Sequence, residues 1–258
     1  MKSRLLASLL AMATTLFLLP GCKKFYNYPN PSQGNVCDLC KITKLLVTTP
    51  VDGKASTVQE YDVNYDAKGN VMNVVRLFEG SIPPNATDQH FRYNKSGLLT
   101  DYYLNYTGNT GVVIWHRYSY PDRYTIVDTQ FNYVGDINDP QPPDTSFSMR
   151  FFTDKLDSKG RIIKNTEDLF VIGFSYDNFG NLVLPGLTYD DKINPYRTSN
   201  TWQLIYSNYS MNNPNPGEII SYNEFGLPTD IKNGYLFLIS FPELRIEYDC
   251  RQAKALYK

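Results

Sequence analysis

Histidine and cysteine are scarce in this chain, which has two His and four Cys among 258 residues. Imidazoles and thiolates are common metal ligands, bases and nucleophiles, so their scarcity leaves little material for such sites. His90 and His116 lack ligand spacing and stand in alternating patterns, where a cross-strand contact is the usual role. The chain also has no G-x-S-x-G elbow and no phosphate-binding glycine loop. We therefore expect no metal, no cofactor and no enzymatic activity.

The chain also lacks helical periodicity and a charge of one dominant sign. No amphipathic helix of useful length can be read from its apolar residues. A composition of 42% hydrophobic residues with 21 Tyr and 14 Phe excludes a disordered polar chain. Basic residues number 25 and acidic residues 26, and no basic stripe interrupts that balance. Nucleic acid is therefore not an expected partner.

The N-terminus has the pattern of a secretory leader. Lys2 and Arg4 precede an apolar run from Leu5 to Pro20, which small residues and a cysteine then close. That run is shorter than the roughly 20 apolar residues that a spanning helix needs. Residues 1–21 are therefore expected to be a cleaved signal for export.

The end of this leader, Leu19-Pro20-Gly21-Cys22, resembles the bacterial lipoprotein box, from which it departs at Pro20. The resemblance implies that Cys22 becomes the acylated N-terminal residue, so that lipid chains hold the protein to a membrane. The alternative is a secreted protein in which Cys22 is incidental. Residues 22–36 carry Pro29, Pro31 and Gly34 without apolar periodicity, and we expect a flexible tether there.

Three cysteines remain beyond the tether, and at most one bridge can join them within the chain. Cys40 directly precedes a strand-like run at 41–49, and Cys250 directly follows another at 244–249. In an antiparallel pair the start of one strand lies beside the end of its partner. The positions therefore favour a disulfide between Cys40 and Cys250, which requires the first and last strands to be neighbours. Pairing of Cys37 with Cys250 stays open, as does a redox or metal role for Cys37-x-x-Cys40.

Five segments share one turn plan: an apolar or aromatic residue, then Asp or Asn, two further residues, and Gly. The Asp or Asn side chain can accept hydrogen bonds from the amides ahead of it, and the glycine can take the left-handed conformation that a bulged hairpin requires. The turn-forming pairs are Asp66 and Gly69, Asn94 and Gly97, Asp157 and Gly160, Asp177 and Gly180, and Asn223 and Gly226.

Alternating apolar runs flank these turns and predict strands with no helix among them. The expected strands include 61–65, 71–78, 99–106, 112–120, 125–133, 147–152, 170–176, 202–206, 218–222 and 235–241. The turns recur at irregular intervals, which excludes a fixed-period propeller or solenoid. We expect residues 37–258 to form a single all-β domain, an antiparallel meander of hairpins whose sheet is closed or nearly closed.

The turn segments resemble the tyrosine-aspartate repeats of RHS-type proteins. The layout as a whole resembles Bacteroidetes lipoproteins of unknown function, including the DUF4595 group with its porin-like fold. The shared features are the lipoprotein box, a cysteine before a first strand reading Cys-Lys-Ile-Thr-Lys, repeated Y-[DN]-x-x-G turns, and a closing Tyr-Asp-Cys that ends at Cys250. The resemblance implies a barrel-like sheet and no particular activity.

Two sets of side chains are candidate binding groups. Tyr102, Tyr103, Tyr106, Trp115 and Tyr118 could stack on a sugar, although strand tyrosines more often fill a barrel interior. Asp136, Asp139, Asp144, Asp190 and Asp191 could bind calcium, but they match no known loop register and are more simply solvated turn residues.

The expected function is that of a non-catalytic cell-envelope lipoprotein, a monomeric binding or structural module for a glycan or a protein. The alternative is a glycan-active hydrolase that uses paired loop carboxylates. An outer-membrane barrel is disfavoured because polar residues such as Asp101 and Arg117 interrupt an apolar outer face. The expected anchor is in the outer membrane. Acidic residues directly after Cys22 would resemble a surface-export signal of this bacterial group, but Lys23 and Lys24 stand there instead, which favours a periplasm-facing domain.

Overall fold

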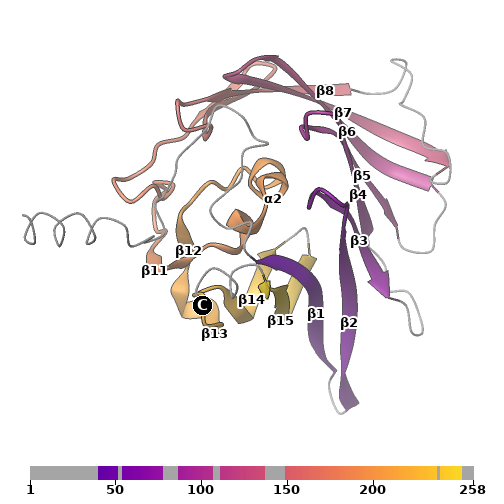
Figure 1. Cartoon of the computed structure of the whole chain (residues 1–258), viewed down its shortest axis with the longest axis vertical. Helices are drawn as coiled ribbons and strands as arrows, with labels where there is room; N and C mark the ends of the chain where they lie inside the picture. The colour runs from indigo at the N-terminus through magenta and orange to yellow at the C-terminus, as the bar shows by residue number, and fades with distance from the viewer. Residues whose placement is uncertain are drawn as a thin grey trace, which may run out of the picture.

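A computed structural model describes residues 40–51, 54–77, 87–106, 111–136, 149–236 and 239–251 (Figure 1). The predicted leader, the lipidated Cys22, the tether and Cys37 lie outside these residues.

The described chain is built mainly of strands. They are β1 (Lys41–Val51), β2 (Lys54–Tyr65), β3 (Val71–Leu77), β4 (Thr87–Tyr93), β5 (Leu99–Tyr106), β6 (Gly111–Asp122), β7 (Thr125–Asp136), β8 (Met149–Leu156), β9 (Ile162–Glu167), β10 (Phe170–Gly173), β11 (Tyr189–Ile193), β12 (Asn212–Pro214), β13 (Ile219–Tyr222), β14 (Pro228–Leu236) and β15 (Ile239–Asp249). The short helices are η1 (Pro195–Thr198), α2 (Asn200–Ile205) and η2 (Pro216–Glu218).

One antiparallel sheet dominates the fold, and its strand order is β10-β9-β8-β7-β6-β5-β4-β3-β2-β1-β15-β14-β13. The strands from β1 to β10 follow chain order, as a meander of hairpins does. The sheet curls around α2 (Figure 1). It does not close, because β10 and β13 are its two edges, and the segment between them carries the small β11-β12 sheet and α2. The prediction of an all-β antiparallel sheet that is closed or nearly closed is confirmed: the sheet is antiparallel and curls, but its two edge strands do not pair.

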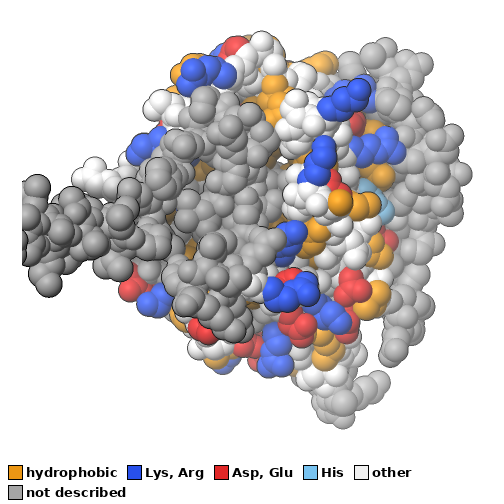
Figure 2. All heavy atoms as spheres, in the orientation of Figure 1, with side chains coloured by type: hydrophobic (Ala, Val, Ile, Leu, Met, Phe, Trp, Pro, Cys, Tyr) orange, Lys and Arg blue, Asp and Glu red, His pale blue; other side chains and the backbone are white. Residues whose placement is uncertain are grey.

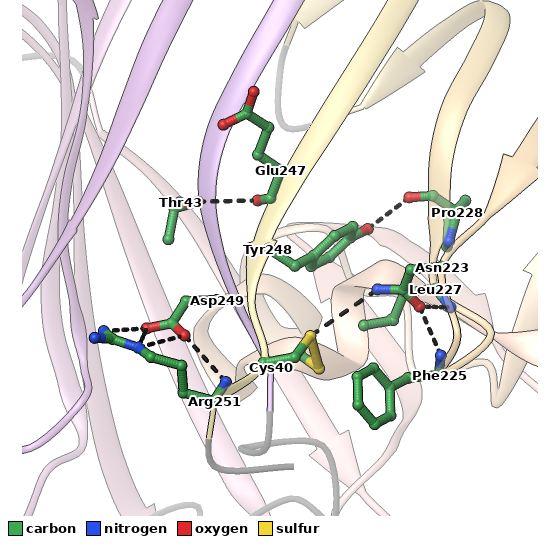
Figure 3. Close-up of a disulfide and its surroundings, with 11 residues drawn as sticks. Cys40, Thr43, Asn223, Phe225, Leu227, Pro228, Glu247, Tyr248, Asp249 and Arg251 are labelled. Carbon is green, nitrogen blue, oxygen red and sulfur yellow. Dashed lines mark hydrogen bonds and ion pairs between the residues drawn. A yellow bond between two sulfur atoms is a disulfide. The ribbon is translucent and has the colours of Figure 1, made fainter. Parts of the chain in front are cut away.

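The first and last strands are neighbours, as the cysteine positions predict. β1 pairs with β15 in a register that sets Leu45 opposite Ile246. A disulfide joins Cys40 to Cys250, with their Cα atoms 4.1 Å apart (Figure 3). This pairing does not by itself close the sheet, because β14 and β13 continue beyond β15.

The five predicted turns share one geometry. In the first, the Asp66 amide donates to the Asn70 carbonyl, and the Gly69 amide donates to the Asp66 carbonyl. The Asp66 carboxylate accepts from the amides of Lys68 and Asn70, at 2.8 Å each. The same side-chain bonds recur at Asn94, Asp157, Asp177 and Asn223. All five glycines have φ between 75° and 88°, a region that residues with a Cβ rarely adopt.

Tyrosine hydroxyls tie neighbouring strands together at the rim of the sheet where these turns lie. Tyr65 at the end of β2 donates to the carbonyl of Ile42 near the start of β1, at 2.8 Å. The same bond runs from Tyr93 to Val71, from Tyr120 to Leu99, from Tyr176 to Ile162 and from Tyr248 to Pro228, at 2.8 to 2.9 Å. Each bond joins, at this rim, two chain segments whose connecting loop lies at the opposite rim. Burial raises the pKa of Tyr65, Tyr93, Tyr176 and Tyr248, so their phenols remain protonated donors.

The prediction of a strand at 202–206 is wrong. Residues 200–205 form α2, and Ser199 caps its N-terminus with a side chain that accepts from the Thr201 amide. Trp202 is 1% exposed and packs edge-on against Phe91 of β4, with ring centroids 5.5 Å apart. Alternation of large residues predicted a strand here, but burial against the concave face of the sheet favours a helical turn instead.

Candidate functional site

The five candidate aromatic residues do not form one exposed stack. Tyr102 and Tyr103 are successive residues of β5, so their rings lie on opposite faces of the sheet. Tyr102 and Tyr118 belong to the core on the concave face, together with Trp202. Tyr103 stacks on Trp115 on the other face, at 4.8 Å between centroids. These four strand residues are at most 7% exposed, which removes them as an open sugar platform. The Tyr106 side chain lies outside the described residues.

The convex face carries a row of stacked rings across β4, β5 and β6. His90 stacks on Tyr103 at 4.9 Å, and the guanidinium of Arg92 lies 5.3 Å from the centroids of both Tyr103 and Trp115. The Trp115 indole donates to Asp101 at 2.9 Å. Burial lowers the pKa of His90, so its imidazole is neutral near pH 7. Cross-strand stacking and cation–π contacts of this kind stabilise a sheet.

The concave face carries a polar cluster on β6, β7, β8 and β9. Nδ1 of His116 lies 2.9 Å from Oδ2 of Asp128, a cross-strand contact of the kind expected for this histidine. Asn165 donates to Asp154 at 2.7 Å. Burial, with a contribution from the charge of Asp128, raises the pKa of Asp154 to about 6. The cluster therefore pairs a carboxyl that holds its proton in weak acid with a carboxyl bonded to histidine, an arrangement that can support acid–base chemistry.

The sequence did not predict this cluster, because its members come from four strands. The two aspartates of the candidate calcium site whose side chains the structure describes make different contacts. Asp190 accepts from Asn213 and from the hydroxyl of Tyr222, so its carboxylate links strands rather than standing in solvent as expected. Asp191 is exposed and pairs with Lys192. Asp139, Asp144 and the Asp136 side chain lie outside the described residues. Within the described ranges, no group of three or more His, Cys, Asp or Glu could hold a metal ion.

Within the part of the chain that the structure describes, the most exposed large apolar side chains lie at and next to the β10 edge of the sheet. Leu169 is 95% exposed and Phe170 is 76% exposed, and Val171 and Ile172 are each more than half exposed. The turn that follows adds further exposed apolar side chains. We define the β10 edge patch as Leu169, Phe170, Val171, Ile172, Phe179, Val183 and Leu184. A soluble domain seldom leaves so many neighbouring apolar residues uncovered without a function.

Among the described strands, the backbone of this edge is also unpaired on one side. β10 pairs only with β9, where Phe170 lies opposite Glu167 and Ile172 opposite Asn165. Alternate residues of an antiparallel strand direct their N–H and C=O groups to opposite sides. Since Phe170 and Ile172 are the hydrogen-bonded positions of this hairpin, the main chain of Val171 and Gly173 points to the unpaired edge. The apolar run at 169–172 was the available sequence signal, but only the strand order shows it as an edge.

Charged side chains of both signs are visible on the described surface in Figure 2. They lie intermixed over the face seen there. The described residues contain no helix long and apolar enough to cross a membrane. No protein-family model and no curated protein sequence matches this chain.

Proposed function

We propose that this chain is a non-catalytic, monomeric lipoprotein of the bacterial cell envelope that binds a protein partner through the β10 edge. In this proposal Cys22 carries the lipid, the anchor is in the outer membrane, and the domain faces the periplasm. The repeated turns support a relationship to RHS-type repeats and to the DUF4595 lipoproteins. The observation that carries the binding function is β10, an edge strand whose four residues are all exposed.

The chemistry of this edge favours a polypeptide over a glycan. Main-chain donors and acceptors at Val171 and Gly173 repeat with the spacing of a strand, and an added strand satisfies both through β-augmentation. Phe170 and Ile172 would contact alternate side chains on one face of that strand, and Val171 would contact those on the other. A sugar would need open rings, whereas Tyr102, Tyr103, Trp115 and Tyr118 are buried. The partner is thus expected to present an extended, apolar, uncharged segment.

Site-specific photocrosslinking in the native host tests this proposal. A photoreactive amino acid at Phe170 is expected to give one discrete adduct with a second protein. The same probe at Val58, which is 59% exposed on the internal strand β2, is the matched control and is expected to give none. Adding Val171→Pro, which removes an outward N–H while leaving the β9 bonds in place, is expected to abolish the adduct.

Three results would contradict the proposal. They are equal labelling from positions 170 and 58, an adduct that survives Val171→Pro, and an adduct made only of two copies of this chain. Far-UV circular dichroism of the Val171→Pro variant, expected to match that of the unmodified protein, shows that loss of the adduct is not loss of the fold.

A glycan-active hydrolase is the second candidate, and Asp128 and Asp154 favour it. The carboxyl of Asp154 has a raised pKa of about 6, as a general acid requires, and it lies near a second carboxyl. These residues stand on strands rather than in loops. Release of reducing ends from peptidoglycan by the purified protein, lost in Asp154→Asn, would replace the binding proposal with this one.

A further inference from the structure

Arg76 of β3 is a buried cation on the concave face of the sheet. It lies opposite Tyr61 of β2 in the register of these strands, and Tyr61 belongs to the core that surrounds α2. The Arg76 residue is only 9% exposed. Burial raises the pKa of Tyr61, and the positive charge of Arg76 opposes this rise because the guanidinium lies close to the phenol.

The guanidinium of Arg76 lacks the partners that a buried charge requires. Its Nε and Nη1 atoms are shielded from solvent and have no hydrogen-bond partner. Asp88, on the neighbouring strand β4, accepts from the main-chain amide of Arg76, at 3.0 Å. The Tyr61 hydroxyl donates to Gln59. Burial of a charged group without hydrogen-bond partners is unfavourable, and these two nitrogens could donate to a negatively charged group.

Several other arginines of the described chain have their charge compensated. Each of them makes an ion pair with a carboxylate. The pairs are Arg117 with Asp101, Arg150 with Glu167, Arg161 with Asp157, Arg245 with Asp230 and Arg251 with Asp249. Most of these side chains are more exposed than Arg76, and yet they are paired. Arg76, by contrast, is deeply buried, and its Nε and Nη1 atoms have no acceptor.

We propose that Arg76 is the anchor of an anion-binding site on the concave face, which takes the oxyanion of a small ligand: a carboxylate or a phosphate group. The planar guanidinium presents donors that match either group, and the surrounding core strengthens the attraction by excluding water. The Tyr61 phenol lies beside the site, and its hydroxyl donates to Gln59, so the guanidinium is the donor proposed for the anion. This site is separate from the β10 edge, so either proposal can fail without the other.

Thermal unfolding of the detergent-solubilised full-length protein at pH 7 tests this site. Sodium phosphate and sodium acetate are compared with sodium chloride at equal ionic strength. At about 100 times its dissociation constant, a bound anion is expected to raise the midpoint by about 5 to 10 °C. A response to acetate alone identifies a carboxylate ligand, and a response to phosphate alone identifies a phosphate group.

Two variants separate binding from a general salt effect. Arg76→Gln is expected to lose the anion response and, in chloride, to unfold at a higher temperature than the unmodified protein because the uncompensated charge is gone. Arg245→Gln, which removes an exposed arginine, is the matched control and is expected to keep the response. Equal midpoints in all three salts would overturn the proposal, as would a lower midpoint for Arg76→Gln than for the unmodified protein in chloride.

Discussion

Each residue of the Y-[DN]-x-x-G turn has a separate physical role. The Asp or Asn side chain orders the turn, and the glycine supplies the left-handed corner. In three of the turns the tyrosine hydroxyl binds a main-chain carbonyl at the same rim, whereas Tyr222 donates to the Asp190 carboxylate. The turn at Asp157 shows what happens without the phenol. Leu156 stands in the tyrosine position there, and the contact to the preceding hairpin is made by its main-chain amide, which donates to the Tyr124 carbonyl.

Tyr93 provides a test of the tyrosine role. Its hydroxyl donates to the Val71 carbonyl and lies 2.8 Å from the Thr201 hydroxyl, so Tyr93→Phe leaves two buried groups without this partner. The expected loss in the free energy of unfolding is about 1 to 2 kcal/mol. Urea denaturation measures it, with Tyr124→Phe as the matched control, because Tyr124 is 39% exposed and its variant is expected to change little. Equal losses in the two variants would show that the hydroxyl contact is unimportant.

The sequence predicted the turns well because their chemistry is local. Asp66 and Gly69 are close in the chain, and the bonds that they make do not depend on distant residues. The tyrosine bonds could not be predicted in this way, since the acceptor of Tyr65 lies 23 residues away and is a main-chain carbonyl, which leaves no mark on the sequence. The same holds for His116 and Asp128, which meet only because β6 and β7 pair in one register.

At the scale of elements, β1 and β15 form the pair that joins the first and last strands of the described chain. Their pairing extends from Lys41 opposite Asp249 to Thr48 opposite Glu243. The disulfide lies just outside this ladder, beside the turn at Asn223, whose side chain approaches the Cys250 sulfur at 4.0 Å (Figure 3). The disulfide therefore reinforces a pairing that the strands also make on their own.

Removal of the disulfide tests how much it contributes. The double variant Cys40→Ser, Cys250→Ser is expected to keep the fold but to lose about 2 to 5 kcal/mol in the free energy of unfolding, because the unfolded chain is no longer cross-linked. Guanidinium denaturation measures the loss. Cys37→Ser is the matched control and is expected to unfold like the unmodified protein. A loss in the control that matches the double variant would instead support pairing of Cys37 with Cys250.

Prediction from the sequence failed where an element depends on its surroundings. The run at 202–206 has the alternation of a strand, and only its position inside the curled sheet makes it a helix. The open edges were likewise not predicted, because apolar runs at 170–176 and 218–222 indicate strands without indicating their neighbours.

At the scale of the whole molecule, the fold buries a carboxyl group on the concave face of the sheet and so makes stability depend on pH. Asp154 is buried beside Asp128, and its pKa rises from 3.8 to about 6. The native state therefore holds this proton more tightly than the unfolded chain does. Between about pH 4 and pH 6 the unfolded chain ionises first, so Asp154 lowers the free energy of unfolding as the pH rises.

The variant Asp154→Asn is expected to lose this dependence while its amide oxygen keeps the bond from Asn165. Its free energy of unfolding, relative to that of the unmodified protein, is expected to rise from pH 4 to pH 6 by at most about 3 kcal/mol and then to stay constant. Denaturation series at several pH values measure this difference. Asp191→Asn changes an exposed carboxylate and should run parallel to the unmodified protein. A constant difference for Asp154→Asn would contradict the assignment.

The disulfide between the first and last strands also determines whether cleavage of the backbone releases a fragment. From Cys40 to Cys250 the backbone and the sulfur bridge together form a covalent ring of 210 residue steps. One cut by a protease at any hairpin tip within the ring opens it without separating the fragments. Only a second cut, or a reductant, can release a piece.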